Sequence, residues 1–238
     1  MRETSNQSLG YLLLALESRF KELIEPSSEQ SCASGKDGRY TYIPLGIPQF
    51  LGALEKAATL LPLTRPVQQG LRTINFIDVG AGWGSKALLA ERYLQTLLPI
   101  YLRGTSAYHV IGHGLEYNEK YAPHHILNKG TYIKGDALEY TEYAKYDIIY
   151  FYCPMYDSSM QSRFEELVYN QAAEGTIFLQ FLKRNSNWAV QPNLHHINGS
   201  NSLFIKTADK ELCQRAKRAL NPDGIFSSWD RCYACEGH

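Results

Sequence analysis

A glycine-rich stretch offers the clearest chemistry in the chain. Residues Asp78–Gly84 read Asp-Val-Gly-Ala-Gly-Trp-Gly, after an apolar run and before a helical pattern. Glycines let the backbone turn sharply and approach a ligand closely, and the free N–H groups of a helix start face the same space. The stretch therefore predicts a site for a nucleotide-like ligand. The third glycine comes one residue early for a nicotinamide cofactor, and Gly84-Ser85-Lys86 does not fit a phosphate-binding loop, so both phosphate-centred interpretations are disfavoured.

The stretch resembles the first motif of the class I methyltransferases that use S-adenosylmethionine, an apolar strand ending in Asp/Glu-x-Gly-x-Gly-x-Gly. The match has no departure at its acidic or glycine positions. The resemblance implies that the loop passes under the methionine part of the cofactor and that Asp78 helps to hold its amino end. The cofactor-binding residues expected in this loop are Asp78, Gly80, Ala81, Gly82, Trp83 and Gly84.

A second acidic residue, Glu116, ends the next apolar run. An acidic side chain at this strand end can accept hydrogen bonds from both hydroxyls of a ribose. Glu116 lies farther past Asp78 than the roughly 20 residues of a compact dinucleotide unit. An inserted loop at Tyr101–Ala107 accounts for much of the excess. We therefore expect Glu116 to bind the ribose, with the adjacent Tyr117 also at the cofactor.

A third acidic residue follows the next run, in Tyr132-Ile133-Lys134-Gly135-Asp136-Ala137. By the same resemblance, the side chain of Asp136 faces the adenine amino group and the backbone N–H of Ala137 meets a ring nitrogen. A lone acidic residue at a strand end is more often a solvated cap than a ligand. Three in order at successive strand ends favour a cofactor site.

The fourth apolar run ends in Tyr152-Cys153-Pro154-Met155-Tyr156-Asp157. The resemblance implies that this end lies over the transferred methyl group, where many amino-methylating relatives carry Asn/Asp/Ser-Pro-Pro-Tyr/Phe. Here one proline and an aromatic remain, but the Asn/Asp and the second proline are absent, which speaks against adenine methylation of DNA or RNA. Methyl transfer needs positioning and the removal of one proton. Asp157 is the candidate base or orienting acceptor, and Tyr152 and Tyr156 are candidate walls of the acceptor pocket, with Tyr152 also counted at the cofactor.

The elements that must position these residues alternate between strands and helices. Strands are predicted at 74–79, 108–115, 131–133, 146–152, 176–181 and 203–206, and helices at 86–98, 119–128, 158–171 and 210–220. Such alternation predicts an α/β fold, Rossmann-like and doubly wound, with a mostly parallel sheet and helices on both faces. Ligands in such sheets bind at the carboxyl ends of the strands.

Two amphipathic helices and a linker are predicted before this region. Apolar residues at helical spacing mark Leu9–Leu23, a polar linker follows at Pro26–Arg39, and a second helix runs from Pro48 to a stop at Pro62. We expect residues 1–70 to be an N-terminal helical extension, serving as a lid or in substrate recognition. Residues 71–238 then form the S-adenosylmethionine-binding methyltransferase domain.

The composition of the chain limits the classes of binding partner that we expect. The 238 residues carry 24 basic and 24 acidic side chains, which removes the usual charge argument for nucleic acid. The best basic cluster is expected to be a solvated helix face or a contact for an acidic or phosphorylated substrate; it comprises Lys183, Arg184, Lys206, Lys210, Arg215, Lys217 and Arg218. Five irregularly spaced cysteines and the lack of a membrane-spanning run predict a cytoplasmic protein with no membrane partner. Cys232-x-x-Cys235 with His238 lacks the second half of a zinc module, so no metal site is predicted.

The sequence as a whole predicts a methyltransferase that uses S-adenosylmethionine and acts on a nitrogen or oxygen of a protein or small-molecule acceptor. One alternative is a non-catalytic, methyltransferase-like binding or regulatory module, favoured by the altered fourth-strand motif. A second alternative is a nucleic-acid methyltransferase. A nicotinamide oxidoreductase is a third, which the glycine spacing disfavours. The acceptor and the oligomeric state have no signal in the sequence.

Overall fold

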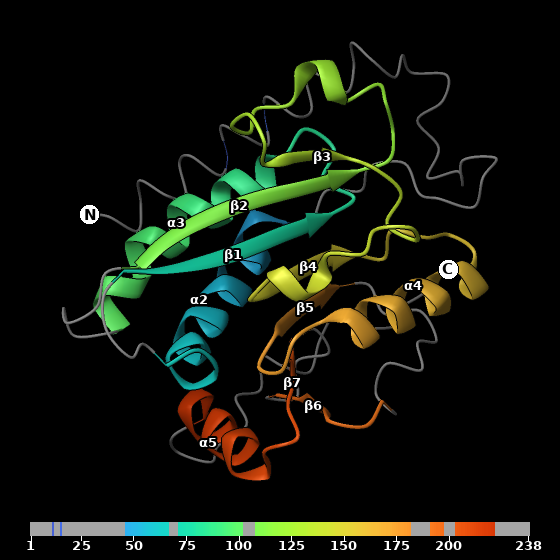
Figure 1. The fold of residues 1–238 in the computed structure, drawn as a ribbon. Coiled ribbons are helices and arrows are strands. Elements are labelled where there is room, and N and C mark those ends of the chain that lie inside the picture. Colours follow the sequence, from blue (N-terminus) through green and yellow to red (C-terminus); the bar gives the residue numbers. More distant parts are fainter. Residues whose placement is uncertain are drawn as a thin grey trace.

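A seven-stranded sheet organises the part of the chain that the structure, a computed structural model, describes (Figure 1). This part comprises residues 11, 15, 46–66, 71–101, 108–181, 191–197 and 203–221. The strands are β1 (Arg72–Val79), β2 (Tyr108–Glu116), β3 (Tyr132–Lys134), β4 (Ile148–Tyr152), β5 (Ile177–Phe181), β6 (Leu194–His196) and β7 (Leu203–Lys206). The helices are α2 (Ile47–Thr64), α3 (Ser85–Tyr101), α4 (Ser158–Gln171) and α5 (Lys210–Leu220), with short 3₁₀ turns η2 (Ala122–His124) and η3 (Tyr143–Lys145).

The strand order is β3-β2-β1-β4-β5-β7-β6. The first five strands in this order pair in parallel, whereas β7 runs antiparallel to both of its neighbours. This is the arrangement of a doubly wound α/β sheet, and the predicted fold class is confirmed. The chain order reverses between the adjacent strands β1 and β4. That point is where such sheets form a ligand crevice beyond the carboxyl ends of their strands.

Helices cover both faces of the sheet (Figure 1), and an apolar core lies on each face. Alternate side chains of β1 point to opposite faces: Phe76 belongs to the core shared with α2, α3 and α5, and Ile77 to the core shared with α4. Phe50 of α2 lies edge-on to Tyr150 of β4, with ring centroids 4.9 Å apart. Helix α2 is thereby packed directly against the sheet.

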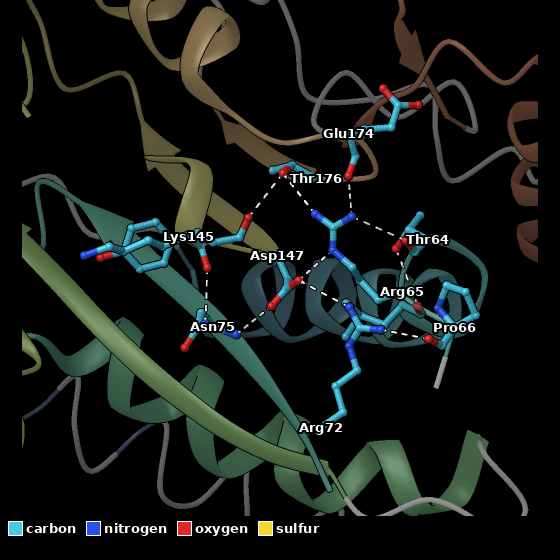
Figure 2. Close-up of polar contacts among 11 residues, drawn as sticks. Thr64, Arg65, Pro66, Arg72, Asn75, Lys145, Asp147, Glu174 and Thr176 are labelled. Atoms are coloured by element: carbon cyan, nitrogen blue, oxygen red, sulfur yellow. Dashed lines mark hydrogen bonds and ion pairs between the residues drawn. The ribbon is translucent and has the colours of Figure 1, made fainter. Parts of the chain in front are cut away.

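A buried ion pair fastens the end of α2 to the amino ends of the strands (Figure 2). The guanidinium of Arg65 donates from Nε to Oδ1 of Asp147 at 2.6 Å, and also donates to the backbone carbonyl of Glu174. The second oxygen of Asp147 accepts from the backbone N–H of Asn75 at 2.9 Å. Because Asn75 belongs to β1 and Asp147 directly precedes β4, this cluster joins α2 to the two central strands.

Several predicted elements match the structure. Helices α4 and α5 and strand β7 have the predicted bounds, and the other predicted strands differ by one or two residues at their ends. The predicted stop at Pro62 is wrong, because Pro62 lies inside α2 and the helix continues to Thr64. The N–H of Arg65 still bonds to the carbonyl of Leu61, at 2.7 Å. The three-residue strand β6 has no counterpart among the predicted strands.

The predicted helix at 119–128 is wrong. Only the turn η2 forms there, around Pro123, whose missing N–H and fixed φ disfavour a helix interior. In addition, the backbone N–H of Ile126 donates to the carbonyl of Trp83 at 3.0 Å, so the end of this segment bonds to the glycine loop. The bonds inside the segment span only three residues, as that from the N–H of His124 to the carbonyl of Tyr121 does. The predicted linker, the inserted loop beyond Tyr101 and the terminal Cys232, Cys235 and His238 lie outside the described residues, as does all of the predicted helix at 9–23 except Tyr11 and Ala15.

Candidate active site

The glycine loop joins β1 to α3 at the carboxyl edge of the sheet. Gly80, Gly82 and Gly84 have φ values of 84°, 53° and 84°, a region that other residues rarely adopt. A Cβ added to Gly84 would lie 2.5 Å from Cγ of Leu127, so the loop has no room for a side chain there. The backbone N–H groups of Gly80 and Ala81 both donate to the carbonyl of Leu115, at 2.9 and 3.1 Å. The loop therefore folds back over the end of β2.

Glu116 lies at the end of β2 with its carboxylate against this loop. Oε2 accepts from the N–H of Gly82 and Oε1 from the N–H of Asn118, both at 2.7 Å. Burial raises the pKa of the Glu116 carboxyl, and these backbone donors oppose that effect. The backbone N–H of Tyr117 is a third such donor. A carboxylate has about four acceptor positions, so that of Glu116 keeps capacity to accept from a ribose hydroxyl.

Asp78 is buried at the end of β1, with 3% of its surface exposed. It lies in register with Gly114 of β2. A Cβ on Gly114 would lie 2.8 Å from Cβ of Ala81, so this glycine provides the space that the loop occupies. The structure thus brings Asp78, the loop and Glu116 together at adjacent strand ends, as predicted from the motif.

Trp83 has a packing position within the loop. Its side chain is 1% exposed and lies edge-on to Tyr121, with centroids 5.3 Å apart. The ring of His124 lies at 5.4 Å. These contacts anchor the glycine loop to the segment after β2, and only the backbone of Trp83 remains for a ligand. Tyr117, in contrast, is 47% exposed at the end of β2.

The third predicted acidic residue, Asp136, follows β3. Its Oδ1 accepts from the backbone N–H of Leu138 at 2.9 Å, which fixes the tight turn after the strand. Ala137 is buried, and its carbonyl accepts from the hydroxyl of Tyr143 at 3.0 Å. The turn that would meet an adenine is therefore held by side chains on both sides of Ala137.

The end of β4 faces the glycine loop. Cys153 has a φ of 41°, an uncommon value for a residue with a side chain. The next residue, Pro154, has its Cβ 3.8 Å from the position of a Cβ on Gly80. Tyr152 is half-buried, and burial raises the pKa of its hydroxyl. Tyr156 is 51% exposed. The turn thus places Pro154 beside the candidate cofactor loop, with Tyr152 before it and Tyr156 after it in the chain.

Asp157 caps helix α4. Its Oδ1 accepts from the backbone N–H groups of Ser159 and Met160, each at 2.9 Å, and from the hydroxyl of Ser159. These hydrogen bonds, with that of the Ser159 hydroxyl first, hold the pKa of the Asp157 carboxyl below its usual value. A carboxylate with a lowered pKa is a weaker base. The geometry gives Asp157 a capping function, and its predicted catalytic function stays a prediction.

A buried polar network behind this turn had no signal in the sequence. The N–H of Met155 donates to Oε1 of Gln161 at 3.1 Å, and Nε2 of Gln161 donates to Glu165 at 2.9 Å. Gln180 of β5 donates to the same Glu165 oxygen at 2.8 Å. All three side chains are at most 4% exposed. They hold the β4 turn to both α4 and β5.

The predicted basic cluster is divided in the structure. Nζ of Lys206 donates to the carbonyls of Tyr169 and Ala172, at 2.6 and 2.7 Å, and so caps the end of α4. Exposed basic side chains on α5 are Lys210, Arg215, Lys217 and Arg218. Lys183 and Arg184 lie outside the described residues. Among the described side chains, no three of the ligand types His, Cys, Asp and Glu gather as a metal site would need.

Comparisons with known proteins gave matches only among solved structures, since no family model and no curated protein matches the chain. One is a putative class I S-adenosylmethionine-dependent methyltransferase from Listeria monocytogenes, with 13% identity over 71% of this chain and 64% of that one, at a TM-score of 0.45. Another is an amino pentose methyltransferase from Micromonospora echinaspora, with 14% identity over 59% and 58% of the two chains and a TM-score of 0.37.

A third match is an S-adenosylmethionine-dependent methyltransferase from Thiobacillus denitrificans in complex with S-adenosyl-L-homocysteine. It has 15% identity over 68% of this chain and 54% of that one, at a TM-score of 0.35. The matched region thus spans between about half and two thirds of these proteins' lengths. The activity, cofactor and partners of the present chain are matters for proposal. No helix in the described ranges has the length and apolar character of a membrane span.

Proposed function

We propose that this protein is a methyltransferase that uses S-adenosylmethionine and transfers the methyl group to a nitrogen or oxygen of a protein or small molecule. The observation that carries the proposal is the meeting of the glycine loop, Glu116 and Asp136 at the carboxyl ends of three adjacent parallel strands. These strands lie beside the point where the strand order reverses, the usual ligand position in such a sheet.

The described residues fit the cofactor without a phosphate site. Beside its backbone donors, the carboxylate of Glu116 keeps acceptor capacity for a ribose hydroxyl. Asp78 would hold the amino end of the methionine part, and Asp136 with the N–H of Ala137 would face the adenine. Within the glycine loop, Gly84 has no room for a side chain, because a Cβ there would lie 2.5 Å from Cγ of Leu127. Bound S-adenosylmethionine would supply an already activated methyl group.

The chain's contribution to the transfer would be mainly to position the acceptor. Tyr152 and Tyr156 follow the end of β4 and would form the walls of the acceptor pocket. Aromatic faces attract cations and methylammonium groups, so these walls suit an amine. Asp157 would hold the start of α4, and hence the adjacent Tyr156, in place through its hydrogen bonds. Positioning contributes much of the rate in a displacement of this kind.

Calorimetric titration with S-adenosylmethionine and S-adenosylhomocysteine tests the cofactor. We expect both to bind, and Glu116→Ala to weaken binding at least tenfold, because a hydrogen bond to a charged group contributes about 1.5–3 kcal/mol. Glu142→Ala is the matched control, since Glu142 is exposed and pairs with Lys145 on η3. A wild-type protein that binds neither compound contradicts the proposal.

A non-catalytic binding or regulatory module is the second candidate, favoured by the engaged carboxylate of Asp157. A labelled-methyl assay against a lysate, separated into protein, nucleic acid and small molecules, distinguishes the two. Transfer that Asp78→Ala abolishes supports the enzyme, whereas cofactor binding without transfer supports the module. Label in nucleic acid, with binding that weakens steeply with salt, would support a nucleic-acid methyltransferase instead.

We also propose a cytoplasmic location and an N-terminal helical extension over residues 1–70, whose helix α2 packs on the sheet of the domain at 71–238. Cys153 and Cys213, the described cysteines, are buried and form no disulfide, which suits a reducing compartment. Limited proteolysis with and without S-adenosylhomocysteine tests the lid. Protection of cleavage sites before residue 46 by the ligand supports a lid in that part of the chain, and unchanged cleavage there contradicts it.

A further inference from the structure

Three residues in one row of the sheet lie under the glycine loop. Asp78 of β1 is in register with Gly114 of β2, and Gly114 is in register with Tyr132 of β3. Side chains in one register row point to the same face of a sheet. Because Gly114 has no side chain, the space between its two neighbours is open to Ala81 of the loop and to Leu127. Tyr132 therefore borders the loop even though it lies two strands away from β1.

Both backbone polar groups of Gly82 bond to side chains. Its N–H donates to Oε2 of Glu116 at 2.7 Å, and its carbonyl accepts from the hydroxyl of Tyr132 at 3.1 Å. Gly82 has a φ of 53° and lacks a Cβ that would limit its rotation. Two side chains from two different strands thus fix one of the three glycines of the loop, a residue type with little conformational restraint of its own.

The ring of Tyr132 is itself held in place. It stacks on the ring of His125, with centroids 4.4 Å apart and planes 8° from parallel. Burial, followed by the nearby charge of Glu116, raises the pKa of the Tyr132 hydroxyl. The hydroxyl therefore stays protonated and remains a donor to Gly82 across the pH range in which proteins are handled.

We infer that Tyr132 is a positioning residue for the cofactor, which holds the peptide groups of Gly82 in the orientation that directs Glu116 toward the ribose. The inference rests on the proposed function for the identity of the ligand. Without the Tyr132 hydroxyl, Gly82 can rotate and its N–H can leave Glu116. Cofactor binding must then restore this order, and a site that is ordered only on binding binds more weakly.

Tyr132→Phe tests the inference, because it removes the hydroxyl and keeps the ring that stacks on His125. We expect the Kd for S-adenosylhomocysteine to rise about three- to tenfold, the ratio that one net hydrogen bond gives. Tyr140→Phe is the matched control: its hydroxyl bonds to that of Tyr146 at 2.8 Å, and neither residue touches the loop. The control is expected to bind like the wild type.

Hydrogen exchange of the ligand-free protein gives a second, independent measurement. In Tyr132→Phe the amide of Gly82 should exchange faster, while amides within β1 keep wild-type rates; a general loss of structure would accelerate both. Unchanged Gly82 exchange together with a Kd within twofold of wild type overturns the inference. If the wild type binds no S-adenosylhomocysteine, the proposed function fails, and the exchange of Gly82 still decides whether Tyr132 orders the loop.

Discussion

The guanidinium of Arg65 and the carboxylate of Asp147 form a 2.6 Å ion pair at the amino edge of the sheet, opposite to the edge that holds the glycine loop. Their side chains are 14% and 12% exposed. Arg65 closes α2, and Asp147 directly precedes β4, so the pair connects a helix from the first 70 residues to the centre of the sheet. Helix α2 is part of the architecture that supports the site.

Removing one partner of this pair should destabilise the protein strongly. In Arg65→Met the largely buried Asp147 keeps only Arg72, whose Nη2 lies 4.0 Å from Oδ1, as a nearby cation, and we expect the loss to cost about 1–3 kcal/mol. The free energy of unfolding in urea measures it. Arg92→Met is the control, because Arg92 is 61% exposed and lies 3.8 Å from Glu91; it should change stability by less than about 1 kcal/mol. Equal stability of the two variants would show that the Arg65–Asp147 pair contributes no more to the free energy of unfolding than an exposed ion pair does.

Gly84 should tolerate no side chain. Gly84→Ala places a methyl group 2.5 Å from Leu127 and also forces a left-handed backbone on alanine. Gly130→Ala is the matched control, since Gly130 has a φ of 91° but nothing within 4 Å of its added Cβ. We expect Gly84→Ala to lose about 1–3 kcal/mol more stability than Gly130→Ala, the cost of overpacking. Weaker binding of S-adenosylhomocysteine should accompany only the first variant.

Local signals were enough for much of the fold. Helix α5 has an acidic cap, Asp209, and an apolar stripe at helical spacing, so its bounds could be predicted from eleven consecutive residues. The helix predicted at 119–128 fails for two reasons: Pro123 is a local signal against a helix interior, and Trp83, far away in sequence, accepts from the N–H of Ile126. A contact between distant segments cannot be read from periodicity, which reports only which face of an element is apolar.

The candidate site divides in the same way. The glycine loop could be predicted from its sequence motif, and Glu116 from its position at the end of a strand. The structure brings the two together. Tyr132 had no such signal, because its function depends on a glycine 50 residues earlier in the chain. The sequence signal for Asp157 was ambiguous, since an acidic residue just before a helix can act either as a base or as the N-cap of that helix.

A comparison of Asp157 with Asp209 can separate a capping function of Asp157 from a catalytic one. Each accepts hydrogen bonds from two backbone N–H groups at the start of its helix. Asp157→Ala and Asp209→Ala should therefore lower Tm by similar amounts, roughly 2–4 °C, the shift expected for the loss of one cap. If Asp157 also orients the methyl acceptor, only its variant should lose methyl transfer beyond the effect of stability. Equal transfer by both variants would leave Asp157 as a cap alone.

The raised pKa of Glu116 predicts opposite effects of pH on binding and on stability. Binding needs the ionised carboxylate as an acceptor, so the affinity for S-adenosylhomocysteine should fall as the pH drops through the raised pKa of the native protein. Stability responds in the other direction. Because the native carboxyl binds a proton more readily than the unfolded chain does, the ionised form costs stability above its native pKa. That cost is relieved as the pH falls through the native pKa.

Calorimetric Kd values and urea unfolding, both measured from about pH 8 down to mildly acidic pH, test this prediction against Glu116→Gln. Glutamine offers one acceptor oxygen where Gly82 and Asn118 both donate, so its NH₂ group must face one of these donors. We therefore expect this variant to bind weakly at every pH and to lose the acid-side fall in affinity. A wild-type affinity that stays constant while the pH drops would show that ionised Glu116 does not hold the ligand.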